Sequence, residues 1–189
     1  MQEAIQKLRN KRVVLRAVLI FLVSYALFLF VWIQVKDYYG TTLTLTASKL
    51  LTLVKDVSYE GVTRVGAAIE VTFSPLSRRN MLVDIPVNTS SYTFNAPLTF
   101  SLMATLWLFI GKKGKAYSEA LLILIGVHLL YVFSLEWKTL TEILMQRGVE
   151  QENTLLLFFS QFLWGFTDNM VIRFEPFLIG FYMYIRFGE

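Results

Sequence analysis

"VVLRAVLIFLVSYALFLFVWIQV", residues 13–35, is the stretch that decides the fold class of this chain. At 1.5 Å per residue, a helix of this length crosses a hydrocarbon core roughly 30 Å thick. Trp32 lies where an interfacial anchor is expected, and basic residues precede the stretch up to Arg12. The apolar run is too long for a signal peptide, and "QVKDYYG" after it offers no small-residue cleavage site. The stretch therefore predicts an uncleaved membrane anchor with a cytoplasmic amino terminus.

Composition supports a membrane protein. Of 189 residues, 55% are hydrophobic and only 17% are charged, and the mean hydropathy is +0.52, which is too apolar for a soluble domain of this length. The net charge of +4 lies partly beside apolar runs, so it indicates orientation in a bilayer and not a nucleic-acid site. The absence of cysteine excludes disulfides and thiolate metal sites. We expect the lipid bilayer as a partner, and no nucleic acid.

Two further spans follow a polar region. The second span is predicted at residues 96–110, with Pro97 in its first turn, where backbone amides lack helical partners. "GKKGK" at 111–115 has the lysines and turn glycines of a cytoplasmic loop. The third span exits near Trp137, and helical spacing of apolar residues predicts that it continues outside as an amphipathic arm at 138–148.

The apolar tail at 154–187 is too long for one simple span. As a helix it would measure about 51 Å, so it must be tilted, broken or partly outside the bilayer. Pro176 is the predicted helix break, because proline cannot donate a hydrogen bond to the carbonyl of residue 172. Two arrangements remain open. Residues 154–166 lie along the outer interface while 167–187 cross, or 154–172 cross while 177–187 lie on the inner surface.

Residues 36–95 form the one sizeable polar region, and the positive-inside rule predicts that it is extracytoplasmic. Residues 42–56 are predicted as a helix. Three short β-rich runs, "VSYEGVTRV", "AAIEVTFS" and "NMLVDIPV", then indicate an antiparallel meander. A sheet of this size cannot hold a core of its own, so it should pack on the preceding helix or on a partner.

The predicted fold class is a membrane all-α bundle of four transmembrane helices with a small extracytoplasmic α+β domain that contains the meander. We expect three parts: a basic cytoplasmic end and first span at 1–35, the extracytoplasmic domain at 36–95, and spans two to four at 96–189. Both termini are predicted to be cytoplasmic, in a bacterial inner membrane.

Four polar residues within the apolar segments are candidates for an intramembrane network: His128, Asp168, Arg173 and Glu175. Charges in a membrane are costly and usually face a protein interior, which supports a functional interpretation. The structural interpretation is that Arg173 and an acid close a helix junction near the interface, while His128 bonds to a neighbouring helix. We favour the structural interpretation, because no second charged span exists to form a relay.

Signatures of catalysis are missing from the sequence. It has no glycine-rich phosphate loop, no GxSxG or HExxH motif, and only one histidine. We therefore predict no enzyme, no catalytic, cofactor-binding or metal-binding residues, and no cofactor.

The order of parts resembles a small bacterial family, the exosortase H-associated membrane proteins. The resemblance rests on the join "VDIPVNTSSYTFNAPLTFSLMA" and on the last helix with its proline and aromatic close, "SQFLWGFTDNMVIRFEPFLIGFYMYI". It covers the whole chain in layout and implies an inner-membrane accessory protein near envelope protein sorting. It implies no active-site residue.

The predicted function is thus a non-enzymatic accessory subunit or assembly factor, which docks an envelope or membrane-complex partner through its extracytoplasmic domain. Two alternatives remain open. One is a small ion- or proton-coupled transporter that uses the four polar residues, and the other is a ligand-free helical subunit of a membrane redox or oxygenase complex.

Overall fold

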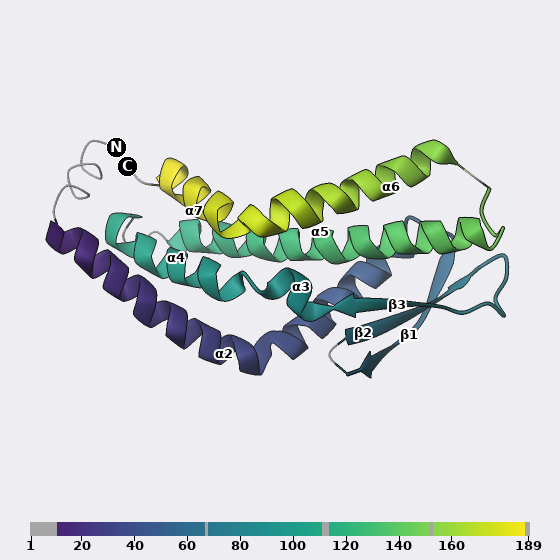
Figure 1. The fold of residues 1–189 in the computed structure, drawn as a ribbon, viewed down its shortest axis with the longest axis horizontal. Coiled ribbons are helices and arrows are strands. Elements are labelled where there is room, and N and C mark those ends of the chain that lie inside the picture. The colour runs from purple at the N-terminus through teal and green to yellow at the C-terminus, as the bar shows by residue number, and fades with distance from the viewer. Residues whose placement is uncertain (1–10, 67, 111–113, 152, 188–189) are drawn as a thin grey trace. The chain divides into compact units, whose positions relative to one another are not determined.

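A computed structural model describes residues 11–66, 68–110, 114–151 and 153–187 (Figure 1). In this part of the chain, four helices are long and apolar enough to cross a membrane. They are Lys11–Leu51, Thr89–Ile110, Gly114–Gln146 and Thr154–Phe187, which confirms the four predicted helices. The basic residues before Lys11 and most of the "GKKGK" loop lie outside the described residues.

The chain divides into two compact units, which are described separately. The first unit comprises Met1–Val35, Phe94–Gly126 and Arg173–Glu189, and the second comprises Lys36–Thr93 and Val127–Ile172. The first boundary coincides with the predicted end of the anchor at residue 35. The second unit also includes Val127–Ile172, which belongs to the part at 96–189 that we expect to hold spans two to four and the outside arm.

The anchor and the following predicted helix form one element, α2 (Lys11–Leu51). Residues 36–41, which lie between the predicted anchor and the predicted helix, are helical, and the helix ends five residues before the predicted end at 56. At Gly40 the helix comes into close contact with Thr89, which lies far away in the sequence. A Cβ on Gly40 would lie 2.2 Å from Cγ2 of Thr89, so only glycine leaves room for that side chain.

The predicted antiparallel meander is confirmed as a sheet of β1 (Val57–Val65), β2 (Ala68–Pro75) and β3 (Val83–Asn88), in the order β1-β2-β3. Alternation between buried and exposed residues is complete in β3, and alternate residues of β2 are also buried. The buried apolar side chains of these two strands are Ile69, Val71, Phe73, Val83, Ile85 and Val87. Three strands cannot enclose this face, so it is covered by the other elements of the second unit.

Helices account for the rest of the chain. After α3 (Thr89–Thr93) and α4 (Ala96–Ile110), α5 (Gly114–Gln146) runs without interruption through the predicted arm at 138–148 almost to its end. Gly148 follows with a φ of +64°, a conformation that suits glycine after a helix. Whether the arm lies outside the membrane stays a prediction.

The apolar tail is helical throughout but changes its hydrogen-bond pattern. It consists of α6 (Thr154–Phe166), the π-helical segment η1 (Thr167–Ile172) and α7 (Arg173–Phe187). The irregularity predicted at Pro176 therefore lies upstream of it, and Pro176 itself sits in the first turn of α7. The reason is that the missing proline donor affects the carbonyl four residues earlier, at Ile172, where the wider π-helical segment ends.

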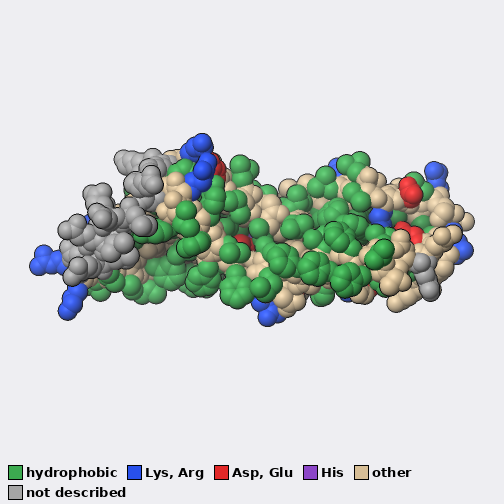
Figure 2. Space-filling view, turned by 90° about the horizontal axis from the view of Figure 1, so that it is seen from above, with side chains coloured by type: hydrophobic (Ala, Val, Ile, Leu, Met, Phe, Trp, Pro, Cys, Tyr) green, Lys and Arg blue, Asp and Glu red, His purple; other side chains and the backbone are tan. Residues whose placement is uncertain are grey.

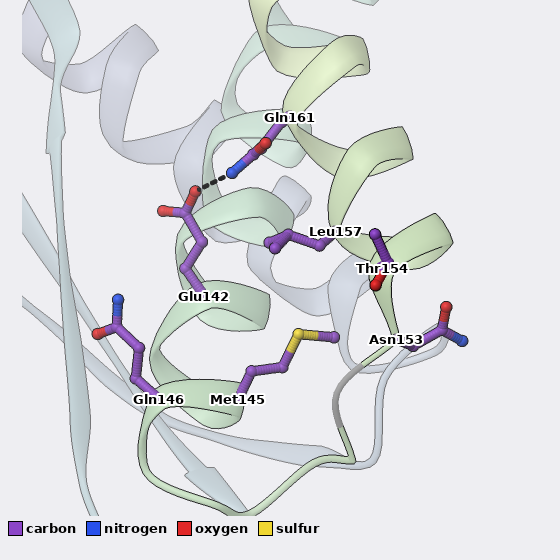
Figure 3. A pocket seen from close by; sticks show the side chains of 7 residues that line it. All are labelled: Glu142, Met145, Gln146, Asn153, Thr154, Leu157 and Gln161. Atoms are coloured by element: carbon purple, nitrogen blue, oxygen red, sulfur yellow. Dashed lines mark hydrogen bonds between the residues drawn. The ribbon is translucent and has the colours of Figure 1, made fainter.

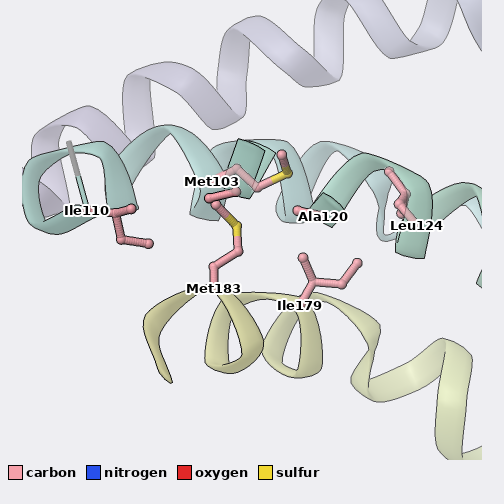
Figure 4. Close-up of a cluster of buried hydrophobic side chains, with 7 residues drawn as sticks. Met103, Ile110, Ala120, Leu124, Ile179 and Met183 are labelled. Atoms are coloured by element: carbon pink, nitrogen blue, oxygen red, sulfur yellow. The ribbon is translucent and has the colours of Figure 1, made fainter. Parts of the chain in front are cut away.

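The first unit has a small apolar core between α4, α5 and α7 (Figure 4). It comprises Met103, Ile110, Ala116, Ala120, Leu124, Ile179 and Met183. Close packing of α4 on α7 depends on Gly180, because a Cβ there would lie 2.3 Å from a methyl group of Leu102. The small residues on α5 and α7 let the helices approach closely, as is usual in membrane bundles.

Hydrophobic side chains are exposed on many of the described elements (Figure 2). On α6, Phe158, Phe162 and Phe166 are exposed and stack along the helix, with ring centroids 6.3 and 6.1 Å apart. The polar Gln161 instead bonds to α5, where its Nε2 donates to Oε1 of Glu142 at 2.9 Å. An apolar outer face of this kind is typical of a helix that contacts lipid.

The close approach at Gly40 yields a stability prediction. Gly40→Ala should lower stability by about 1–3 kcal/mol through overpacking against the stiff, buried Thr89. Gly126→Ala is the matched control, because nothing lies within 4 Å of the added Cβ and alanine favours a helix. Thermal unfolding in mild detergent, followed by circular dichroism, measures both. Equal midpoints for the two variants would contradict the contact.

Candidate functional site

A buried stripe on α5 organises the interior of both units. Every fourth residue of the helix is buried, and because four residues turn a helix by about 400°, the stripe advances around it by about 40° per step. The stripe consists of Ala116, Ala120, Leu124, His128, Val132, Glu136, Leu140 and Leu144. Its first three residues are apolar and belong to the first unit. Its remainder lies in the second unit and includes two titratable side chains, His128 and Glu136.

His128 is fully buried and is held by two tyrosines from different helices. Its Nδ1 lies 2.8 Å from the hydroxyl of Tyr39 on α2. The rings of Tyr39 and of Tyr92 on α3 both meet the imidazole edge-on, each with a centroid distance of 5.7 Å. This is the bond to a neighbouring helix that the structural interpretation expects.

Asp168 belongs to the same cluster. The Asp168 carboxylate on η1 lies close to the hydroxyl of Tyr131, one turn after His128 on α5. The ring of Tyr131 also stacks on Tyr92, with centroids 5.2 Å apart. His128 and Asp168 are thus joined through tyrosines in what we call the His128 cluster: Tyr39, Tyr92, His128, Tyr131 and Asp168.

The other two predicted residues lie elsewhere. Glu175 is buried in the first unit, where Thr99 of α4 donates to its Oε1 at 2.9 Å. The side chain of Arg173 is exposed, and among the described residues no ion pair joins it to an acid. The arginine–acid closure of the helix junction is therefore not found in this part of the chain. The four residues form no single described network.

Glu136 is a buried acid that the sequence prediction missed. Its side chain is fully buried, and the hydroxyl of Ser48 on α2 donates to Oε1 at 2.8 Å. Its Oε2 has no hydrogen-bond partner among the described residues. The pKa of Tyr59 on β1 is raised above its ordinary value by the burial of its own hydroxyl and, to a lesser extent, by the negative charge of Glu136. Glu136 directly precedes Trp137, where the third span is predicted to leave the membrane, so the sequence did not place it among the buried residues. The four-residue stripe was the signal that marks it as buried.

An ion pair closes the second unit near the ends of α2 and α5. The Nζ of Lys55 lies 2.8 and 2.7 Å from the two carboxylate oxygens of Glu150. The Lys55 side chain is only 5% exposed. A buried amine with both carboxylate oxygens in reach is well compensated, so this pair has a structural role.

A cavity of about 400 Å³ lies between the end of α5 and the start of α6 (Figure 3). Among its described lining residues the one charged group is Glu142, which accepts from Gln161 and lies 3.3 Å from the Nζ of Lys138. Lys138 also sits over the ring of Trp164. The other lining side chains are amides, a hydroxyl and apolar groups: Met145, Gln146, Asn153, Thr154 and Leu157. The lining pairs no nucleophile with a base, and the described residues contain no group of three His, Cys, Asp or Glu suited to a metal ion.

Comparison with known proteins shows the family. The family model described as exosortase H-associated membrane protein matches residues 9–187, nearly the whole chain. The chain belongs to this family. No curated protein and no solved structure matches it. The resemblance inferred from the order of its parts is therefore confirmed.

The Tyr39–His128 contact yields a second prediction. Tyr39→Phe removes the hydroxyl beside a fully buried imidazole nitrogen, so the protein should lose about 1–3 kcal/mol of stability. Tyr38→Phe makes the same change on the adjacent residue, which is 79% exposed, and should have no effect. Urea or thermal unfolding in detergent compares the two. A loss of equal size in both variants would contradict the assignment.

Glu136 yields a third prediction. No cation pairs with its buried carboxyl group in the described part of the chain, so a neutral side chain of the same shape should replace it well. Glu136→Gln should therefore keep most of the stability, whereas Glu136→Ala should lose about 2–5 kcal/mol through the cavity that it leaves. Stability of both variants in the same detergent provides the test. A glutamine variant as unstable as the alanine variant would show that the carboxyl group itself is required.

Proposed function

We propose that this protein is a non-enzymatic accessory subunit or assembly factor of the bacterial inner membrane, linked to exosortase-type protein sorting. In this proposal, residues 36–95 lie outside the cytoplasm and dock an envelope partner. The family supports a membrane protein associated with an exosortase. The docking role is our own proposal, and the open edge of the sheet carries it.

The open edge belongs to β1, a strand of nine residues. Among the described residues, the backbone hydrogen bonds of β1 run to β2 and, at Val57, to Lys55. The edge away from β2 therefore presents donors and acceptors that another extended segment can bind. The last residues of β1, from Thr63 to Val65, are also exposed.

The opposite edge of the sheet is less suited to strand addition. Pro86 in β3 stands opposite Glu70 of β2, and proline has no backbone N–H to donate. Proline on an edge strand is a common means of preventing further pairing. The asymmetry between β3 and β1 supports docking at β1.

Proline substitutions at two neighbouring positions test this proposal. In an antiparallel edge strand, one residue directs its amide to the paired strand and the next directs it outward. Of Val62→Pro and Thr63→Pro, one should therefore disturb the sheet, and the other should leave the fold intact while removing an outward donor. The expected result is that the intact variant no longer co-purifies an envelope protein that the unchanged chain retains from native membranes in mild detergent.

Gel filtration identifies the variant that keeps its fold, and mass spectrometry identifies the co-purifying protein. If the well-folded variant retains its partner at the unchanged ratio, β1 is not the docking edge. If the unchanged chain travels as a lone monomer, the accessory-subunit proposal itself fails.

A further inference from the structure

The turn between β2 and β3 and the end of α5 together form a basic surface, here called the basic tip: Arg78, Arg79 and Arg147. We infer that the basic tip binds acidic side chains of the partner protein. This inference rests on the proposed function and specifies the chemistry of the partner. Its test below does not depend on the identity of that partner.

Backbone contacts hold the basic tip together. Within the turn, the amide of Arg78 donates to the carbonyl of Pro75 at 3.0 Å, and the amide of Met81 donates to that of Arg78 at 2.9 Å. Arg147, just after α5, donates from its guanidinium to the carbonyl of Leu82 at 3.4 Å. The three arginines are exposed, and they come from two segments that are far apart in the sequence.

The turn also borders a shallow hollow of about 580 Å³ that is open to solvent. Its lining combines the two guanidinium groups with other polar side chains and an apolar margin: Leu76, Ser77, Arg78, Arg79, Asn80 and Met81. A guanidinium group offers paired N–H donors that match both oxygens of a carboxylate. The charge and donors of the hollow therefore suit an acidic side chain.

Among the described residues, the acids in the neighbouring segments compensate the basic tip only in part. Glu150 is engaged by Lys55. Asp56 and Asp84 are exposed and keep their charge, since the hydroxyl that Thr72 donates to Asp84 is neutral. Two carboxylates thus stand against three guanidinium groups. No ion pair of Arg78 or Arg79 is found among the described residues. The surplus of positive charge calls for an anionic partner.

Two observations favour a protein over an anionic lipid surface. Attachment to a membrane surface usually involves clusters of about four to eight basic residues, and the basic tip has three. Val57, the first residue of β1, pairs with Pro75, the residue immediately before the basic turn. A segment bound along β1 therefore reaches the end of the sheet at which the basic turn begins, and only a polypeptide uses both features.

Charge reversal with a synthetic acidic probe tests the inference. The full chain is reconstituted in phosphatidylcholine nanodiscs, and binding of a fluorescent polyglutamate peptide is followed by anisotropy. Arg78→Glu and Arg79→Glu should each weaken binding about fivefold or more, and added salt should weaken it in the unchanged chain. Lys49→Glu makes the same charge change at an exposed site on α2 and should alter binding less than about twofold.

Unchanged affinity in the arginine variants, or an equal loss in Lys49→Glu, would overturn the inference. If the change to glutamate impairs folding, Arg78→Gln and Arg79→Gln serve as neutral variants. They should also weaken binding of the peptide, but by a smaller factor. Nanodiscs in which phosphatidylglycerol replaces about a third of the lipid test the other source of negative charge. Loss of peptide binding there would assign the basic tip to lipid. Failure of peptide binding leaves co-purification through β1 standing, so the two proposals fail separately.

Discussion

The length of two helices against the thickness of a bilayer is the constraint on which the rest of this structure depends. α2 has 41 residues and α5 has 33, so they measure about 61 and 50 Å, against a hydrocarbon core of about 30 Å. In each helix the apolar residues come first and the polar residues follow. In our proposal each helix carries its polar half beyond the hydrocarbon, and the sheet belongs to the unit that contains both polar halves.

Within that unit, three polar contacts connect the stretch from α2 to Lys55 with the stretch from α5 to Glu150. In order along the chain, these contacts join Tyr39 to His128, Ser48 to Glu136, and Lys55 to Glu150. Residue numbers rise together on both sides, so the two helices run in the same direction. First and third spans that run in parallel are what a chain with four spans requires. The buried polar residues of α5 thus hold α2 in register, and α2 in turn supports the sheet.

Length and periodicity were sufficient to predict the four long helices and the meander, because each depends on local sequence. The continuous helix through "KDYYG" was not predicted, since its passage depends on the contact between Gly40 and Thr89, which are far apart in the chain. The π-helical segment lies upstream of Pro176 because the proline has no N–H to donate to the carbonyl of Ile172, four residues earlier. Among the polar residues, His128 and Asp168 could be recognised singly. Their connection through Tyr92 and Tyr131 joins three segments of the fold, α3, α5 and η1, and has no signature in spacing.

Placement of residues 36–95 outside the cytoplasm is the central claim of this account, and thiol labelling tests it most directly. The chain has no cysteine, so single cysteines report unambiguously. Ser77→Cys lies in the exposed turn of the sheet, and Ser118→Cys lies near the exposed start of α5. In right-side-out membrane vesicles, a membrane-impermeant maleimide should label the first at once and the second only after permeabilisation. Labelling of Ser118→Cys in sealed vesicles, with protection of Ser77→Cys, would contradict the account.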